Sequence, residues 1–464
     1  MRIALRFAVL VFAACFLSVT STDLHAQSIC GTGVCVLTWH NDTYRTGQNL
    51  NESALTYNSI NKDTLGQRCS VGLDGQVYAQ PLVATNVTIN NVFYPWVVYV
   101  VTQYDTLYAI NGTPPQGVNQ TCQIIRQLPF LSTSGLPTNG QYPVDCAEIG
   151  GGHCTSMDPY VGILGTPVIN VSGGTGTIYL VTETQDAKTG ASNWYHYLYA
   201  VDIQSLQATS WVEVLPSGGC TLKGCFSQTH IQRPGLLLAN CGSGCQNKNY
   251  VYVTFSMMDG AGIPYTYGAM FGYNAANLSD PNVFFLQTSQ GGTAHDGAGM
   301  WMGGAGPAFG TDSGGQSWIY VTTANGTFDL TSGGSDASDS LLKLNPNGLA
   351  IGTPSGGYGY FTPVDQAYRG NDVQCNPPKG NDVDFGSGGV MLVPDNQLAN
   401  WPYLAVSGDK EGGLWFVDRT NLGGYNTACG NSCNCTPSNS GNNIQTYWTG
   451  SAYRGNTIHG DAAF

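Results

Sequence analysis

The chain has 464 residues, of which 62 are glycine and 22 proline, whereas only 10% are charged. So little Glu, Lys and Arg beside so much glycine argues against helical bundles and coiled coils, and a hydrophobic share of 42% argues against general disorder. The formal net charge of −13 removes the basic surface that nucleic-acid binding requires.

The first 26 residues have the pattern of a secretory signal peptide. Arg2 and Arg6 give a positive start, an apolar run follows over 7–19, and Ala26 is a small residue at a plausible cleavage point. The apolar run is too short to cross about 30 Å of hydrocarbon, so it does not predict a transmembrane anchor, and no later stretch predicts one. We therefore expect a signal peptide at 1–26, a mature chain at 27–464, and a secreted or periplasmic protein.

Cysteine usage agrees with an oxidising compartment. Of 15 cysteines, Cys15 falls in the signal segment, and the number that remains is even. A thiolate metal site at 429–435 is the alternative to disulfides, but this segment contains no histidine and lacks the paired spacing of zinc ribbons. We therefore expect no metal site. Three cysteines have no close cysteine neighbour in the sequence: Cys69, Cys122 and Cys375. The disulfide candidates, all close in sequence within loops, are Cys30, Cys35, Cys146, Cys154, Cys220, Cys225, Cys241, Cys245, Cys429, Cys433 and Cys435.

One unit occurs five times along the mature chain. Each copy has a short segment with Gly or Pro, an alternating run around a tyrosine, and a third run that ends in Asn or Asp; several copies close with a fourth apolar run. Period-two alternation of β-branched and aromatic residues indicates strands. The alternating runs are 98–102, 178–182, 251–254, 319–322 and 403–407, and the third runs end at Asn111, Asp202, Asn274, Asn345 and Asp418.

Four short strands in every repeat are typical of a β-propeller, in which each sheet packs against its neighbours. A β-sandwich array is the alternative, but it would not require Asn or Asp after every third strand, where such a side chain can cap the next turn. We interpret the chain as all-β, with five complete four-stranded blades and the start of a sixth at 451–453. Because open strand edges invite aggregation, we expect a chain truncated relative to a longer parent; closure by dimerisation is the alternative.

The segment Trp39-His40-Asn41-Asp42-Thr43-Tyr44-Arg45-Thr46-Gly47-Gln48-Asn49 resembles the start of secreted bacterial, acidobacterial-type proteins with pyrroloquinoline-quinone-type repeats. The resemblance continues at 74–82, 232–236, 325–329, 386–390 and 410–412, and it covers nearly all of the mature chain. It implies a propeller similar to that of quinoprotein alcohol dehydrogenases.

The chain also departs from those enzymes. They resemble one another in a vicinal Cys-Cys disulfide against the quinone and in the blade signature Ala-x-Asp-x-x-Thr-Gly-x-x-x-Trp. No Cys-Cys pair occurs here, and only Ala200, Asp202 and Trp211 approach the signature. A quinone with three carboxylates and a bound calcium needs clustered cations and oxygen ligands, whereas Lys and Arg are few and scattered. We expect no cofactor; pyrroloquinoline quinone with calcium is the alternative.

Ligand sites of propellers usually lie where loops meet at a mouth of the central channel. The loops between the second and third strands carry polar residues that would converge on one side of the molecule. Turn formation is the alternative role for each of them. The candidate ligand-binding residues are Asp105, Glu183, Asp186, Asp259, Asn325, Asp329 and Lys410, and no catalytic residue is assigned.

Two functions are compatible with this pattern. The favoured one is an exported, non-catalytic propeller that binds a polysaccharide or a cell-surface protein, or acts as a scaffold. The alternative is a pyrroloquinoline-quinone-dependent oxidoreductase of the alcohol or sugar dehydrogenase type.

Overall fold

The computed structural model describes residues 28–31, 34–53, 55, 58–60, 66–113, 120–149, 157–191, 193–215, 230–257, 267–289, 297–353, 357–369, 383–410, 412–425 and 443–448. Within these ranges the chain is nearly all β, as the sequence predicts. The α-helix α1 has only four residues, Gln366–Arg369. The 3-10 helices are single turns at Phe130–Ser132, Cys146–Glu148, Ser243–Cys245, Met302–Gly304, Leu330–Ser332 and Phe385–Ser387.

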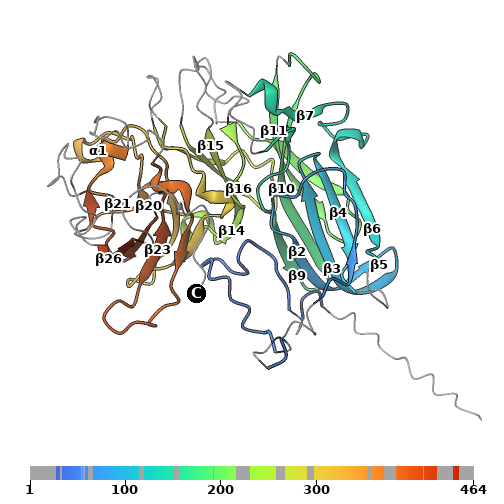
Figure 1. Cartoon of the computed structure of the whole chain (residues 1–464), viewed down its shortest axis with the longest axis horizontal. Coiled ribbons are helices and arrows are strands. Elements are labelled where there is room, and N and C mark those ends of the chain that lie inside the picture. The colour runs from blue at the N-terminus through green and yellow to red at the C-terminus, as the bar shows by residue number, and fades with distance from the viewer. Residues whose placement is uncertain are drawn as a thin grey trace, which may run out of the picture.

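Five antiparallel sheets follow one another in chain order, and each contains four strands taken in sequence (Figure 1). The first has β2 (Leu82–Ile89), β3 (Val92–Thr102), β4 (Thr106–Asn111) and β6 (Ile124–Pro129). The second has β9 (Val168–Ser172), β10 (Thr175–Gln185), β11 (Trp194–Asp202) and β12 (Ala208–Glu213). The third has β14 (Leu237–Asn240), β15 (Asn249–Met257), β16 (Ala269–Asn274) and β17 (Phe284–Gln287). The fourth has β18 (Ala308–Thr311), β19 (Ser317–Thr322), β20 (Leu341–Leu344) and β21 (Tyr360–Thr362). The fifth has β22 (Val390–Leu392), β23 (Leu404–Gly408), β24 (Gly413–Asp418) and β26 (Asn443–Trp448).

Short strands extend this frame. The second sheet gains β7 (Tyr142–Asp145) and β8 (Tyr160–Val161), and the third gains β13 (His230–Ile231). A parallel pairing joins β25 (Gly424–Tyr425) to β21 of the fourth sheet. The two-residue strands β1 (Cys69–Ser70) and β5 (Gln120–Thr121) pair with each other, also in parallel.

The third strand of every sheet ends in the same local turn. In each case the carboxylate or amide oxygen of the final Asn or Asp accepts a hydrogen bond from the backbone N–H two residues later, at 2.8–3.1 Å. This is the Asx turn expected for these positions, and it reverses the chain without help from other parts of the molecule. The five residues are Asn111, Asp202, Asn274, Asn345 and Asp418.

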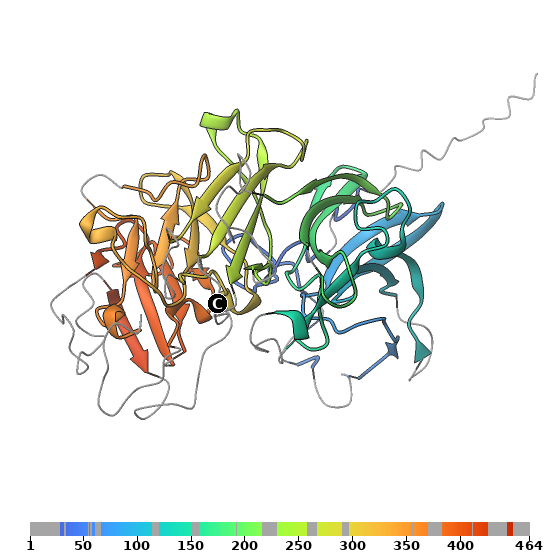
Figure 2. The same cartoon turned by 90° about the horizontal axis from the view of Figure 1, so that it is seen from above.

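Consecutive sheets pack face to face. Alternate residues of the second, third and fourth sheets enter one buried apolar cluster with the sheet before and another with the sheet after, and the first and fifth sheets each share one such cluster with a neighbour. In the second sheet, for example, Ile178 and Leu180 face the first sheet, whereas Tyr179 and Val181 face the third. The sheets therefore run in chain order across the molecule (Figure 2), as successive blades of a propeller do. The number of blades in a closed ring stays a prediction.

An N-terminal segment, residues 36–47, touches the first strand or its entrance in all five sheets; we call it the axial segment. Its backbone exchanges hydrogen bonds with Val83 of the first sheet, at 2.8–2.9 Å, and accepts them at 2.7–2.8 Å from strands of the second, fourth and fifth. The Arg45 side chain reaches the Leu236 carbonyl, which precedes β14 of the third sheet. In Figure 1 the segment, in dark blue, passes between the first two sheets and the later ones. The first strands thus surround this segment.

Disulfide bonds are present, as the cysteine pattern predicts. They join Cys30 to Cys35 and Cys241 to Cys245, which are close neighbours in the sequence. Cys146 is also disulfide-bonded, and Cys154, Cys220, Cys225, Cys375, Cys429, Cys433 and Cys435 lie outside the described residues. The bond between Cys69 and Cys122 was not anticipated, because these cysteines are 53 positions apart and meet only through β1 and β5.

Candidate functional site

The axial segment occupies the place where the first strands of the sheets meet. Arg45 at its centre is fully buried. Its guanidinium donates to the Pro307 carbonyl at 2.9 Å, to the Thr38 hydroxyl at 2.7 Å and to the Trp39 carbonyl at 3.0 Å, with longer contacts to two further carbonyls. A Cβ at Gly306 would lie 2.8 Å from the Gly235 backbone oxygen and 2.9 Å from Arg45 Nη2, so this close approach requires glycine. Gly306 and Pro307, at the entrance to the fourth sheet, therefore pack directly against the buried Arg45 side chain.

A first polar cluster lies where the second strands of the first two sheets end. Asp105 and Glu183 come from these two sheets, and both are buried. The charge of Glu183 acts on Asp105, which indicates that the two carboxyl groups lie close together. Glu183 accepts a hydrogen bond from the backbone N–H of Gln232, which precedes the third sheet. Three successive sheets therefore contribute to this cluster.

Burial favours the uncharged forms of the groups in the first cluster. Desolvation raises the pKa of Glu183 to about 8. It also holds the pKa of Asp105 well above its ordinary value, and the charge of Glu183 adds to this effect. His196 Nε2 lies 3.8 Å from Glu183 and 2.8 Å from the His230 carbonyl, but burial lowers the pKa of His196 to about 4. His196 is therefore neutral and donates to that carbonyl, rather than forming an ion pair with Glu183.

A second polar cluster lies between the fourth and fifth sheets. Arg369, at the end of α1, is fully buried and contacts Asp365 at 2.9 Å and Asp409 at 3.1 Å. Asp409 also accepts hydrogen bonds, both at 2.7 Å, from the backbone N–H of Gly413 and from the Trp415 indole. This carboxylate is therefore held by its own loop and strand and by the arginine of α1.

Three further groups belong to the second cluster. Lys410 forms an ion pair with Asp384, and Asp384 accepts a hydrogen bond from the Asn325 backbone N–H at 3.1 Å. Asp339 accepts from the Phe385 N–H at 3.0 Å. Burial raises the pKa of Asp339 well above its ordinary value, and the nearby Arg369 lowers it in part. The cluster holds its charges in internal pairs.

The structure brings the candidate residues together in pairs from adjacent sheets. Asp105 meets Glu183, and Asn325 and Lys410 both contact Asp384. Asp186 and Asp329 bond within their own loops: Asp186 accepts from the Asn193 amide at 2.8 Å, and Asp329 from the Asp336 N–H at 2.7 Å. Asp259 lies outside the described residues. A single mouth lined by all of them stays a prediction.

Sequence reasoning did not single out four members of these clusters: His196, Asp339, Arg369 and Asp384. His196 sits within an alternating aromatic run, where a polar residue at an inward position is the signal that was available. Arg369 ends the four-residue helix α1 and Asp384 precedes a single 3-10 turn, so the contacts of Arg369 with Asp409 and of Asp384 with Lys410 depend on tertiary packing.

The fit of a quinone cofactor can be tested against these groups. A quinone with three carboxylates needs cations that face a cavity, together with oxygen ligands for its metal. The fully buried cations of the described chain instead contact protein acceptors. Lys343 lies 2.8 Å from Asp312, Arg419 pairs with Asp395, and Arg45 and Arg369 are held as described above. The described residues therefore do not fit this cofactor.

Comparisons with known proteins concern the fold. No family model and no curated protein matches the sequence. Among solved structures, a quinohemoprotein alcohol dehydrogenase of Pseudomonas putida HK5 is 12% identical, with a TM-score of 0.47 over 90% of this chain and 48% of that one. The corresponding enzyme of Comamonas testosteroni is 15% identical, with a TM-score of 0.48 over 84% and 48%. The chain is similar to quinoprotein alcohol dehydrogenases. This chain spans about half the length of either enzyme.

BamB from Moraxella catarrhalis is a further structural match, at 10% identity and a TM-score of 0.33, over 88% of this chain and 83% of BamB. In the described part of the chain, no helix is long and apolar enough to cross a membrane. Nor do His, Cys, Asp and Glu side chains of these residues gather in threes in a metal-binding arrangement.

Proposed function

We propose that this quinoprotein-like chain is an exported, non-catalytic β-propeller that binds a partner or serves as a scaffold. The observation that carries the proposal is the axial segment, which hydrogen-bonds to the first strands and fills the place where a channel ligand would sit. The two polar clusters support it, because their charges are buried and paired or suppressed. We also propose that the five sheets are blades of one ring, and that the partner is a polysaccharide or a cell-surface protein.

Cofactor loading tests this proposal against the oxidoreductase alternative. The purified full chain is mixed with pyrroloquinoline quinone and Ca²⁺, freed of unbound cofactor, and its absorbance is recorded; an apo quinohemoprotein alcohol dehydrogenase treated alongside is the positive control. We expect no retained quinone and no dye-linked oxidation of ethanol or glucose. Stoichiometric quinone with alcohol- or sugar-dependent dye reduction would establish the alternative.

Export is tested separately. Expression with the native leader in a Gram-negative bacterium, followed by mass spectrometry of the periplasm and medium, should yield a chain that begins at Gln27. An uncleaved chain confined to the cytoplasm would contradict this part of the proposal.

A further inference from the structure

A groove opens between the second and third sheets, at the end of the strands opposite the two polar clusters. Its volume is about 560 Å³, within the usual range for ligand sites. One wall is the face of the second sheet that packs against the third, and the other comes from the ends of β15 and β16. The residues that line it are Asn170, Thr177, Tyr179, Ala200, Thr209, Ser210, Lys248, Asn249, Asn274, Ala275, Ala276 and Leu278.

The groove crosses the full width of the second sheet. Asn170 of β9 lies directly opposite Thr177 of β10, and Ala200 of β11 lies directly opposite Ser210 of β12. Four adjacent strands extend over about 14 Å, since neighbouring strands are about 4.8 Å apart. A short linear oligomer matches a groove about 14 Å long, whereas a single compact ion would fill only a small part of it.

The chemistry of the lining selects an uncharged ligand rich in hydroxyl groups. The polar side chains are mostly amides and hydroxyls, and among the described residues of the lining the cation Lys248 is the only charged side chain. Lys248 acts on Asp280, whose pKa is lowered mainly by hydrogen bonds from Asn274 and Asn282 and to a smaller extent by Lys248. An anionic ligand would compete with Asp280 for this cation, and an apolar ligand would leave the amides and hydroxyls without partners.

Hydrogen-bonding groups in the groove are available to a ligand. Among the described residues, the hydroxyls of Thr177 and Ser210 make no hydrogen bond with another protein group, and both side chains are half-exposed. Tyr179 and Leu278 form the buried part of the lining, and Ala276 is an exposed small residue of it. Hydroxyl groups presented in a groove match the hydroxyl groups of a sugar chain.

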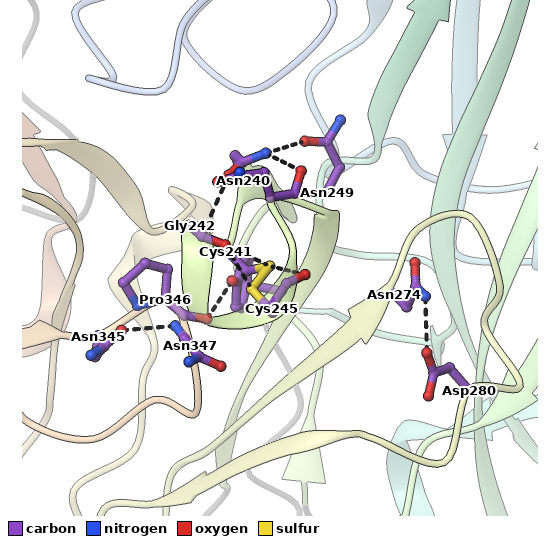
Figure 3. The surroundings of a disulfide bond; sticks show 12 residues. Asn240, Cys241, Gly242, Cys245, Asn249, Asn274, Asp280, Asn345, Pro346 and Asn347 are labelled. Atoms are coloured by element: carbon purple, nitrogen blue, oxygen red, sulfur yellow. Dashed lines mark hydrogen bonds between the residues drawn. A yellow bond between two sulfur atoms is a disulfide. The ribbon is translucent and has the colours of Figure 1, made fainter.

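The wall formed by the third sheet is held rigidly. Lys248 and Asn249 end the loop between β14 and β15, which the Cys241–Cys245 disulfide closes (Figure 3). The Asn240 side chain bonds across this loop to the Asn247 carbonyl and to the Gly242 N–H. On the adjacent turn, the Asn274 amide donates to Asp280 at 2.9 Å (Figure 3). A preformed wall lowers the entropic cost of ordering a bound ligand.

From this geometry we propose that the groove between the second and third sheets binds a short segment of a neutral polysaccharide. The inference rests on the proposed function and assigns its partner a chemical class and a site. It also moves ligand binding away from the loops between second and third strands, where the sequence had led us to expect it.

Calorimetric titration of the full chain with cellotetraose, mannotetraose and maltotetraose tests the proposal, and tetragalacturonate and a Gly-Ser peptide of similar length represent other ligand classes. The protein is produced without glycosylation, because Asn170 stands in an Asn-x-Ser sequon. We expect at least one neutral tetrasaccharide to bind with a Kd below about 1 mM, more tightly than the other two probes.

Variants locate the site. Ser210→Trp, which fills the groove, should weaken binding at least about tenfold, and Asn170→Ala about fivefold, as expected for one lost hydrogen bond. Ser313→Trp, in an exposed turn of the fourth sheet, and Asn193→Ala, at the other end of the second sheet, are matched controls that should bind like the parent chain. Circular dichroism checks that each variant is folded.

Three results would overturn the inference: a folded parent chain that binds no tetrasaccharide, preferential binding of tetragalacturonate or the peptide, or binding that Ser210→Trp and Asn170→Ala leave unchanged. None of these results bears on quinone loading. Failure of this inference and failure of the proposed function are therefore distinguishable.

Discussion

Replacing Arg45 tests whether the axial segment holds the sheets together. In Arg45→Met the side chain keeps its apolar stem but loses every N–H donor. Two carbonyls and one hydroxyl, those of Pro307, Trp39 and Thr38, then lose hydrogen bonds of 2.7–3.0 Å. An unsatisfied buried acceptor costs about 1–3 kcal/mol, and a hydroxyl can reorient, so we expect a loss of about 3–5 kcal/mol of unfolding free energy. That is a large fraction of the stability of an ordinary domain, about 5–15 kcal/mol.

Urea unfolding followed by circular dichroism and tryptophan fluorescence measures this loss as a shift of the midpoint at constant slope. Arg126→Met is the matched control, because Arg126 is half-exposed and bonds to the exposed Asn90 at 2.7 Å. The control should change stability by less than about 1 kcal/mol.

Limited proteolysis supplies a second measurement. If the axial segment leaves the centre of the molecule, cleavage near residues 36–47 should be faster in Arg45→Met than in Arg126→Met. Equal midpoints and equal cleavage rates for the two variants would refute the role assigned to this segment.

Two further predictions follow from buried groups and from chain connectivity. Burial raises the pKa of Glu183 to about 8 in the folded chain. The folded state therefore holds this proton more tightly than the unfolded state does. The free energy of unfolding should fall as pH rises from about 4.5 to 8. Glu183→Gln keeps an acceptor for the Gln232 N–H, so its urea midpoint should fall less over this range; the same slope in both proteins would contradict the burial argument. The Cys69–Cys122 disulfide closes a separation of 53 residues and Cys30–Cys35 one of 5. Replacing both cysteines by serine should therefore cost about 4 kcal/mol for the first pair and about 2 kcal/mol for the second, and thermal unfolding of the two variants should show that order.

The repeating parts of the fold were predictable because they depend on local chemistry. Alternation around a central tyrosine in each repeat predicts strands, since side chains of a strand point to opposite faces in turn. The Asn or Asp after each third strand predicts a turn, since its side chain bonds to the backbone two residues later, as Asn111 and Asp418 do. Each of these two signals spans only a few consecutive residues, so it can be recognised in a single repeat. Its recurrence in five repeats makes the prediction of a repeated four-stranded sheet specific.

The axial segment was recognisable from sequence, but its role was not. Its motif identified a resemblance, whereas most of its contacts with the sheets are made by its backbone, as at Thr43 and Tyr44. Backbone hydrogen bonds can be made by nearly every residue type, so they cannot be predicted from the identity of the residues. Arg45 carried no distinguishing signal in the sequence, because a buried arginine is identified by its surroundings in the fold rather than by its neighbours in the chain.

The candidate site depended on contacts that sequence reasoning does not resolve. Asp105 and Glu183 were selected because equivalent loops follow equivalent strands, and adjacent sheets do bring these two residues together. Asp186 and Asp329 satisfied the same criterion but bond within their own loops. Position in a repeat fixes where a loop begins, whereas the direction of each side chain is set by turns whose lengths differ between repeats.

The two ends of the sheets offer different groups to a ligand. At the end where the loops between second and third strands lie, Asp105 and Asp409 are fully enclosed, whereas Asp186 is exposed and bonds to Asn193. At the other end, the groove between the second and third sheets leaves the side chains of Asn170, Thr177 and Ser210 partly exposed. The sheets position those groups firmly, since each lies in a strand rather than in a loop. This contrast supports the proposal that recognition takes place at the junction between two sheets.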